Sequence, residues 1–187
     1  MHRAKFALTT IALAIALIAP QGARAADYGE SIDTGSNFTC VSRADGYVWC
    51  WGDNSFGQLG NGTFTNSKVP VRIEGFRGVI KVVTGSTHAC ALRYNGKVWC
   101  WGSFRPDGSS IASPTKVAKL KAARDLTAGG GHTCALKPNG TVWCWGDNAY
   151  GQIGNGTLVD AVTPKKVSGL KSRSEEHTSE LQSHVRI

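Results

Sequence analysis

Six cysteines are the residues of this 187-residue chain whose spacing most directly indicates chemistry. They form three pairs with nine residues between the members of each pair, namely Cys40 and Cys50, Cys90 and Cys100, and Cys134 and Cys144. Such thiols can form disulfides, stay as buried free thiols or bind a metal. His88 and His132 each stand two residues before a cysteine, which is the reason to consider a metal. Zinc sites usually bring two cysteines within two to four residues of each other, and that spacing is absent.

The residues between the paired cysteines predict a β-hairpin in each case. Asp45-Gly46, Asn95-Gly96 and Asn139-Gly140 are turn dipeptides between runs rich in β-branched and aromatic residues. A three-residue loop with glycine in the left-handed position places Cys40 opposite Cys50. The same register sets the members of the other two pairs opposite each other. Because directly opposed strand residues are close enough for a disulfide, we expect three disulfides, each within one hairpin.

The hairpins belong to internal repeats whose equivalent positions lie 50 and 44 residues apart. The aligned segments, all ending in Val-Trp-Cys-Trp-Gly, are residues 37–52, 87–102 and 132–146. The first and third repeats continue alike through residues 53–63 and 147–157. The second repeat replaces this tail with residues 103–110, a connection six residues shorter.

The strands of these repeats predict sheets that are covered on both faces. Along residues 98–101 the apolar side chains alternate onto both faces of the strand, and such a sheet must be buried on both sides. Further strands are predicted at residues 79–84 and 69–73. Sheets stacked around an axis satisfy this requirement, and a repeat of 44 to 50 residues is the size of one propeller blade. The fold class predicted is therefore all-β.

The repeat carries a family resemblance. Its start, Gly-x-x-His-x-Cys-Ala-Leu, occupies residues 85–92 and 129–136, and its tail, Gly-Asp-Asn-x-x-Gly-Gln-Leu/Ile-Gly-Asn-Gly-Thr, occupies residues 52–63 and 146–157. This pattern resembles the regulator of chromosome condensation repeat over about residues 27–172. The resemblance implies a β-propeller, usually of about seven blades with about four antiparallel strands in each.

The resemblance also implies how much of such a ring is present. We expect a β-propeller fragment of about three blades, at about residues 26–75, 76–119 and 120–172. Three blades of that curvature do not close a ring, so we expect a longer, seven-bladed parent protein. The second repeat departs from the pattern by lacking the tail, and Phe38 replaces the histidine of the first repeat.

The two ends of the chain differ in character from the repeats. Residues 1–25 combine a basic start, an apolar run of 14 residues from Phe6 to Ala19 and the small-x-small sequence Ala23-Arg24-Ala25. This layout predicts a signal peptide cleaved before Ala26, and the run is shorter than the roughly 20 residues that span a bilayer. We therefore expect a bacterial protein that is secreted or periplasmic.

Residues 173–187 are unlike any part of the repeats. From Arg173 to His184 they match one reading frame of a widely used short-read sequencing adapter, codon for codon. We expect this tail to be an assembly artefact, with the natural protein continuing past about Ser172 in a different sequence. The alternative is a natural polar tail.

The charge of the repeats identifies no partner. Without residues 1–25 and 173–187 the chain has 16 basic and 10 acidic residues, a net charge of about +6. The basic residues cluster only at Lys116, Lys119, Lys121 and Arg124, where a solvated loop is favoured over a nucleic-acid patch. We therefore expect no nucleic-acid partner and no membrane span.

The sequence contains no pattern typical of catalysis. It lacks a Gly-x-Ser-x-Gly elbow, a His-Glu-x-x-His helix and a phosphate-binding loop. His88 and His132 recur within the repeat, which favours a structural hydrogen bond over a role as a base. We therefore expect no catalytic, cofactor or metal residues.

The sequence is compatible with three functions. The favoured one is a non-catalytic scaffold for binding another protein or a cell-surface component, because the resemblance includes secreted propellers that inhibit β-lactamases by protein contact. One alternative is the propeller part of a larger exported enzyme. The other is the nucleotide-exchange role for which the family was named, which the predicted signal peptide disfavours. Fold by itself does not decide between these functions.

Overall fold

A computed structural model describes residues 28–170 of the chain. Within that range the chain forms twelve β-strands and no helix, which confirms the all-β prediction. No helix long and apolar enough to cross a membrane occurs in this part of the chain. The predicted signal peptide (1–25) and the predicted adapter-derived tail (173–187) lie outside the described residues.

The twelve strands form three antiparallel sheets of four strands each. Blade 1 contains β1 (Ser31–Thr34), β2 (Phe38–Ser42), β3 (Val48–Gly52) and β4 (Ser67–Arg72). Blade 2 contains β5 (Val79–Thr84), β6 (His88–Arg93), β7 (Val98–Gly102) and β8 (Ile111–Lys116). Blade 3 contains β9 (Asp125–Ala128), β10 (His132–Leu136), β11 (Val142–Gly146) and β12 (Ala161–Lys166).

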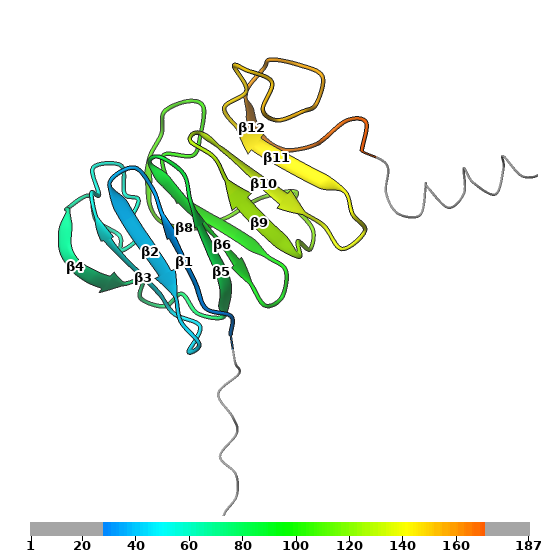
Figure 1. Cartoon of the computed structure of the whole chain (residues 1–187). Coiled ribbons are helices and arrows are strands. Elements are labelled where there is room, and N and C mark those ends of the chain that lie inside the picture. Colours follow the sequence, from blue (N-terminus) through cyan, green and yellow to red (C-terminus); the bar gives the residue numbers. More distant parts are fainter. Residues whose placement is uncertain (1–27, 171–187) are drawn as a thin grey trace, which may run out of the picture.

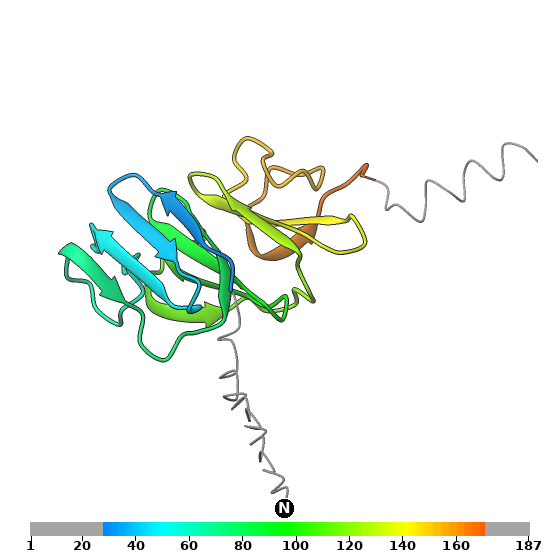
Figure 2. The same cartoon turned by 60° about the horizontal axis from the view of Figure 1, so that its bottom comes forward.

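The blades lie side by side in chain order, with blade 2 between the other two (Figure 1). A second view shows the same order, with the faces of neighbouring sheets turned toward each other (Figure 2). The first strands of the sheets meet, because β1 contacts β5 and β5 contacts β9. Each sheet therefore has its first strand on the inner side and its fourth strand on the outer side, as in a propeller. The chain is a propeller fragment of three blades, as predicted.

Each central hairpin closes with the predicted turn. In blade 1 the Arg43 N–H donates to the Tyr47 carbonyl at 3.1 Å, and Gly46 has a φ of 80°. A Cβ atom on Gly46 would lie 2.5 Å from the ring of Tyr28, so space as well as backbone conformation requires glycine here. The turn fixes the register of β2 and β3, in which Cys40 lies opposite Cys50.

The six cysteines lie in pairs across these hairpins. The Cα atoms are 4.2 Å apart in Cys40–Cys50 and 4.1 Å apart in both Cys90–Cys100 and Cys134–Cys144, and each pair is joined by a disulfide in the structure. Every bridge links strands two and three of one sheet, and none links two blades. The geometry thus fits the predicted pairing, while oxidation in the cell stays a prediction.

The loop after β3 joins blade 1 to blade 2. The indole N–H of Trp101, which is fully buried in β7, donates to the Gln58 carbonyl at 2.8 Å. Gly60 lies so close that a Cβ atom there would be 2.7 Å from the same indole nitrogen. The Gly-Gln-Leu-Gly tail of one repeat is therefore the element that covers the tryptophan of the next blade.

The equivalent contact is missing between blades 2 and 3. Trp145 occupies the position of Trp101 in β11 and is 1% exposed, yet its indole N–H has no hydrogen-bond partner within residues 28–170. The cause is the shorter connection at residues 103–110, which lacks the Gly-Gln-Leu-Gly sequence. The two interfaces therefore differ in one buried hydrogen bond.

This difference predicts that replacing the buried tryptophan with phenylalanine costs more in blade 2 than in blade 3. Trp101→Phe breaks a buried hydrogen bond and leaves the Gln58 carbonyl unpaired, so we expect a loss of about 1–3 kcal/mol of unfolding free energy. Trp145→Phe removes a donor that has no partner, so its cost should be smaller by about 1 kcal/mol or more. Chemical denaturation of both variants at neutral pH measures the difference. Equal losses would contradict the hydrogen-bond argument.

The disulfide prediction is tested on exported protein. Non-reducing digestion should release Cys40–Cys50, Cys90–Cys100 and Cys134–Cys144 as linked peptides, because these residues are directly opposed in the hairpins. Replacing Gly96 with valine should lower the yield of the second bridge alone, since valine resists its φ of 74°. Linkages between blades, or free thiols in the exported protein, would overturn the pairing.

Candidate functional site

One end of the blades carries the two longest connections, residues 53–66 and 147–160. The segments that lie there join the first to the second strand or the third to the fourth strand of each sheet, and they are residues 35–37, 53–66, 85–87, 103–110, 129–131 and 147–160. We call this end the loop face. The opposite end carries the tight hairpin turns and the links between blades.

A pocket of about 380 Å³ opens on the loop face beside the inner strands. It is lined by the first connection of all three blades, that is, by residues 34–36, 84–86 and 128–130. The Ser86 N–H donates to the Gly130 carbonyl at 2.9 Å, which joins two of these connections. The lining consists of small residues and exposed backbone, and it includes no carboxylate, histidine or cysteine. The pocket therefore offers backbone hydrogen bonds and shape rather than acid–base chemistry.

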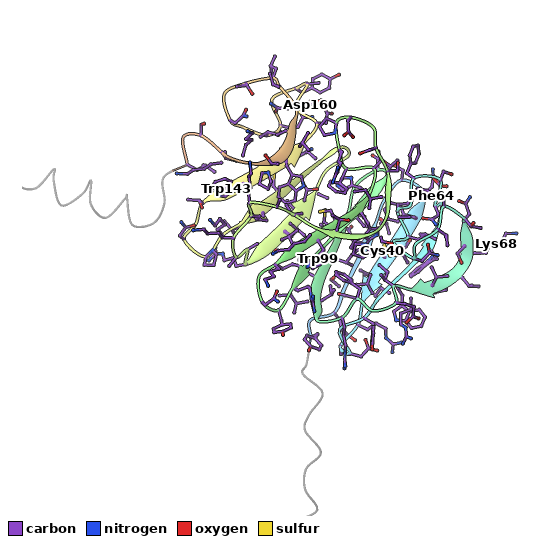
Figure 3. All side chains as sticks on the ribbon, turned by 180° about the vertical axis from the view of Figure 1, so that it is seen from behind. Cys40, Phe64, Lys68, Trp99, Trp143 and Asp160 are labelled. Atoms are coloured by element: carbon purple, nitrogen blue, oxygen red, sulfur yellow. A yellow bond between two sulfur atoms is a disulfide. The ribbon has the colours of Figure 1, made fainter. Side chains whose placement is uncertain are left out.

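Large apolar side chains stand exposed on the two long loops of this face. Phe56 is 42% and Phe64 54% exposed in blade 1, while Tyr150 is 92% and Leu158 68% exposed in blade 3. The positions are equivalent in the two repeats, since Phe56 aligns with Tyr150 and Phe64 with Leu158. Figure 3 labels Phe64 on the first of these loops and Asp160 on the second. Exposure at matched positions indicates a repeated surface feature.

Buried asparagines hold the two long loops in one shape. The Asn54 side-chain amide donates to the carbonyls of Thr63 and Thr65 at 2.9 and 3.1 Å, and its oxygen accepts from the Leu59 N–H at 2.9 Å. Asn148 makes the same three bonds in blade 3. The loops are therefore rigid platforms, and side chains exposed on them lose little entropy on binding.

An aspartate at the start of the first long loop adds to this order. The Asp53 carboxylate accepts bonds from the Ser55 hydroxyl and N–H and from the Gln58 amide, and these hydrogen bonds, those of Ser55 foremost, lower the pKa of Asp53. The group is therefore a loop organiser that stays ionised, and a carboxylate held in this way is poorly suited to act as a general acid.

His88 is a buried contact between blades 2 and 3. Its Nε2 lies 2.9 Å from the Thr133 hydroxyl, with which it forms a hydrogen bond. Burial, with a smaller contribution from the charge of His132, lowers the pKa of His88 to about 4. Phe38 holds the same place in blade 1 and packs in one core cluster with Ala89, the equivalent of Thr133. The histidine therefore has the structural role that the sequence predicts.

The cysteines lie in the sheets and not on the loop face. All six are in strands two and three, where five are almost fully buried and Cys134 is half-buried. Within residues 28–170 no three His, Cys, Asp or Glu side chains gather as a metal site would require. The cysteines thus support the fold, and the loop face is a separate feature.

The basic cluster lies away from the loop face. Lys119, Lys121 and Arg124 belong to the link between β8 and β9 and are exposed, and Lys116 ends β8.

No sequence pattern singled out Phe56, Phe64, Tyr150 and Leu158 as surface residues, because apolar residues in a strand-rich repeat are usually predicted to lie in the core. The signal available was their place beside Gly and Asn in a loop rather than in an alternating run.

The low pKa of His88 predicts a pH dependence of stability. Its pKa in the fold is below the ordinary value of 6.5, so its contribution is complete above about pH 6.5 and is lost as pH falls toward 4. We expect the unfolding free energy to fall by up to about 3 kcal/mol between pH 6.5 and pH 4, because each pKa unit corresponds to about 1.4 kcal/mol. Denaturation at several pH values measures it.

The matched control copies the neighbouring interface. The double variant His88→Phe with Thr133→Ala reproduces the Phe38–Ala89 pair of blades 1 and 2 and should flatten the pH dependence between 6.5 and 4. An unchanged pH dependence in that folded variant would show that His88 is not its source.

Comparisons with known proteins agree on one family. Models of the regulator of chromosome condensation (RCC1) repeat match residues 45–92 and 139–179, and a second model of the same repeat matches residues 30–58 and 123–152. Together they cover more than half of the chain, and the unmatched stretch between them contains the shortened connection. No curated protein matches the sequence.

Several solved structures share this fold, among them structures of yeast RCC1 (Prp20). Human WBSCR16 superposes with a TM-score of 0.68 at 23% identity, over 80% of this chain and 42% of its own. Yeast RCC1 (Prp20), solved bound to Kap60, gives 0.65 at 20% identity over 78% of this chain and 38% of its own.

A second structure of Prp20p from Saccharomyces cerevisiae, described with its binding to Gsp1p and histones, gives a TM-score of 0.65 at 19% identity, over 82% of this chain and 47% of its own. The chain thus spans less than half the length of these propellers, and at these identities the likeness shows the fold. Repeat matches and fold together assign the chain to the regulator of chromosome condensation (RCC1) repeat family.

Proposed function

We propose that this protein is a non-catalytic binding scaffold whose loop face contacts another protein or a cell-surface component. The observation that carries the proposal is the exposure of Phe56, Phe64, Tyr150 and Leu158 at matched positions on loops that are held rigid. Aromatic anchors dominate the binding energy of protein interfaces, and pre-organised loops reduce the entropy lost on association. The structure of Prp20p is described with its binding to Gsp1p and histones, which supports protein binding as a use of this fold.

The pocket on the loop face supports a role without catalysis. Its lining of glycine, serine, threonine and alanine offers no side chain that exchanges protons near neutral pH. His88, the histidine with the altered pKa, is buried between blades and bonded to Thr133 rather than open to a substrate. The loop face is thus better equipped to recognise a surface than to transform a substrate.

We further propose that the protein acts outside the cytoplasm. Three cysteine pairs at disulfide distance are compatible with an oxidising compartment, where such bonds persist. The predicted signal peptide at residues 1–25 points to the same compartment. This location would place the loop face in contact with extracytoplasmic or surface proteins.

The test compares the two ends of the molecule. A partner captured from extracytoplasmic fractions is purified, and its affinity is measured for the exported chain and for the variant Tyr150→Ser with Leu158→Ser. Both residues are exposed, so folding stability should change by less than about 0.5 kcal/mol. Loss of two anchor residues should weaken binding by about 30-fold or more.

Tyr94→Ser is the matched control. Tyr94 is 63% exposed but lies at the opposite end of blade 2, beside the hairpin turn. Its substitution should leave affinity within about twofold. If Tyr94→Ser weakens binding and the variant Tyr150→Ser with Leu158→Ser does not, the loop face is not the binding surface. Chemical turnover of the captured partner would overturn the non-catalytic role.

A further inference from the structure

A pocket lies at the interface between blades 2 and 3. The pocket has a volume of about 140 Å³ and is lined by residues 104–105, 115–118, 162–164 and Trp145. An apolar cavity of about 150 Å³ admits a group of the size of benzene. The indole N–H of Trp145 is buried at this pocket and has no partner among the described residues. A buried donor without an acceptor is costly, so its position marks a place for a ligand atom.

The preceding interface shows what fits in this place. There the Gln58 carbonyl accepts from the indole N–H of Trp101 at 2.8 Å. The Gly62 N–H donates to the carbonyl of Ala112, the second residue of β8, at 2.8 Å. Leu59, fully buried, packs in one cluster with Ile73, the residue that follows β4. One glycine-rich loop therefore supplies an acceptor, a donor and an aliphatic side chain.

The pocket presents equivalents of the three groups that contact the glycine-rich loop in the preceding interface, but no such loop fills it. Trp145 replaces Trp101 as donor, and Val162 replaces Ala112 as the second residue of the outer strand, here β12. Val117, which follows β8, replaces Ile73, which follows β4. In the described structure, the backbone of residues 103–110 forms no hydrogen bond to β12. Phe104 packs against the core of this interface, but the pocket remains beside it.

We propose that this pocket binds a glycine-flanked loop of a partner protein, which inserts as the missing tail of the second repeat would. A backbone carbonyl of the partner accepts from the Trp145 indole N–H, a backbone N–H donates to the Val162 carbonyl, and an aliphatic side chain packs on Val117. This site lies between the outer strands β8 and β12 and is separate from the pocket at the inner strands.

The charge around the pocket narrows the class of partner. Arg105 and Lys116 line it, and Lys165 and Lys166 are exposed on β12 next to it. Opposite charges across an interface favour encounter and fix register more than they add affinity. The partner loop should therefore carry an acidic residue at a flank, as residues 53–63 do with Asp53 at their start.

The experiment uses that natural loop as a probe. A blocked synthetic peptide with the sequence of residues 53–63 is titrated into the exported chain, and the six tryptophan indole N–H signals are followed by NMR. We expect saturable binding with a downfield shift of the signal assigned to Trp145, because it gains an acceptor. Trp145→Phe should weaken binding about five- to tenfold, the value of one hydrogen bond.

Two further variants isolate the other contacts. The peptide with Leu59→Ser loses its aliphatic group and should bind at least about tenfold more weakly. Replacing residues 103–110 of the chain with residues 53–66 should fill the pocket from within, shift the Trp145 signal without added peptide and abolish peptide binding. If this graft does not fold, Trp145→Phe and the peptide with Leu59→Ser still test whether the peptide binds in this pocket.

The outcomes separate this site from the loop face. Absence of saturation at millimolar peptide, or binding that Trp145→Phe leaves unchanged, would overturn the inference. Binding lost in the variant Tyr150→Ser with Leu158→Ser but kept in Trp145→Phe would also overturn it, by placing the peptide on the loop face. None of these results would affect the proposed function, which is tested with a different partner and different residues.

Discussion

The need to bury both faces of the central strands is the constraint on which the structure depends. In blade 2 the strands β6 and β7 are buried along almost their whole length, with Trp101 covered by blade 1 and Leu92 packed in the cluster shared with blade 3. A sheet of this kind is stable only between two others. The order of the blades, the position of the inner strands and the closeness of the loops all follow from that requirement.

The same constraint separates the structural residues from the surface residues. Cysteines, tryptophans and the recurring histidine lie in strands two and three, where they are buried or half-buried, so their chemistry is used to hold the fold. Each disulfide ties one hairpin, and on the chain-entropy estimate closing such a short loop contributes about 3 kcal/mol. At the loop face, two long loops held by buried asparagines present exposed aromatic side chains.

Small differences between repeats change the character of each interface. Phe38 with Ala89 makes an apolar contact between blades 1 and 2, whereas His88 with Thr133 makes a polar, pH-sensitive contact between blades 2 and 3. The shorter connection of the second repeat leaves Trp145 without the acceptor that Trp101 has. Two interfaces built on one plan therefore differ in polarity and in whether the buried tryptophan has a hydrogen-bond acceptor among the described residues.

The amino-acid sequence by itself determined the local structure of this protein. Turn dipeptides such as Asn95-Gly96 set the hairpin register, that register placed the cysteines in opposed pairs, and the repeat length indicated blades, because these features depend on neighbours along the chain. Tertiary structure alone decided which apolar residues are exposed, so that Tyr150 is surface and Trp145 core. It also decided that Trp145 lacks an acceptor, since the acceptor of its counterpart comes from a residue 43 positions away in the preceding blade. Contacts between blades depend on how sheets stack, and a pattern within one repeat does not contain that information.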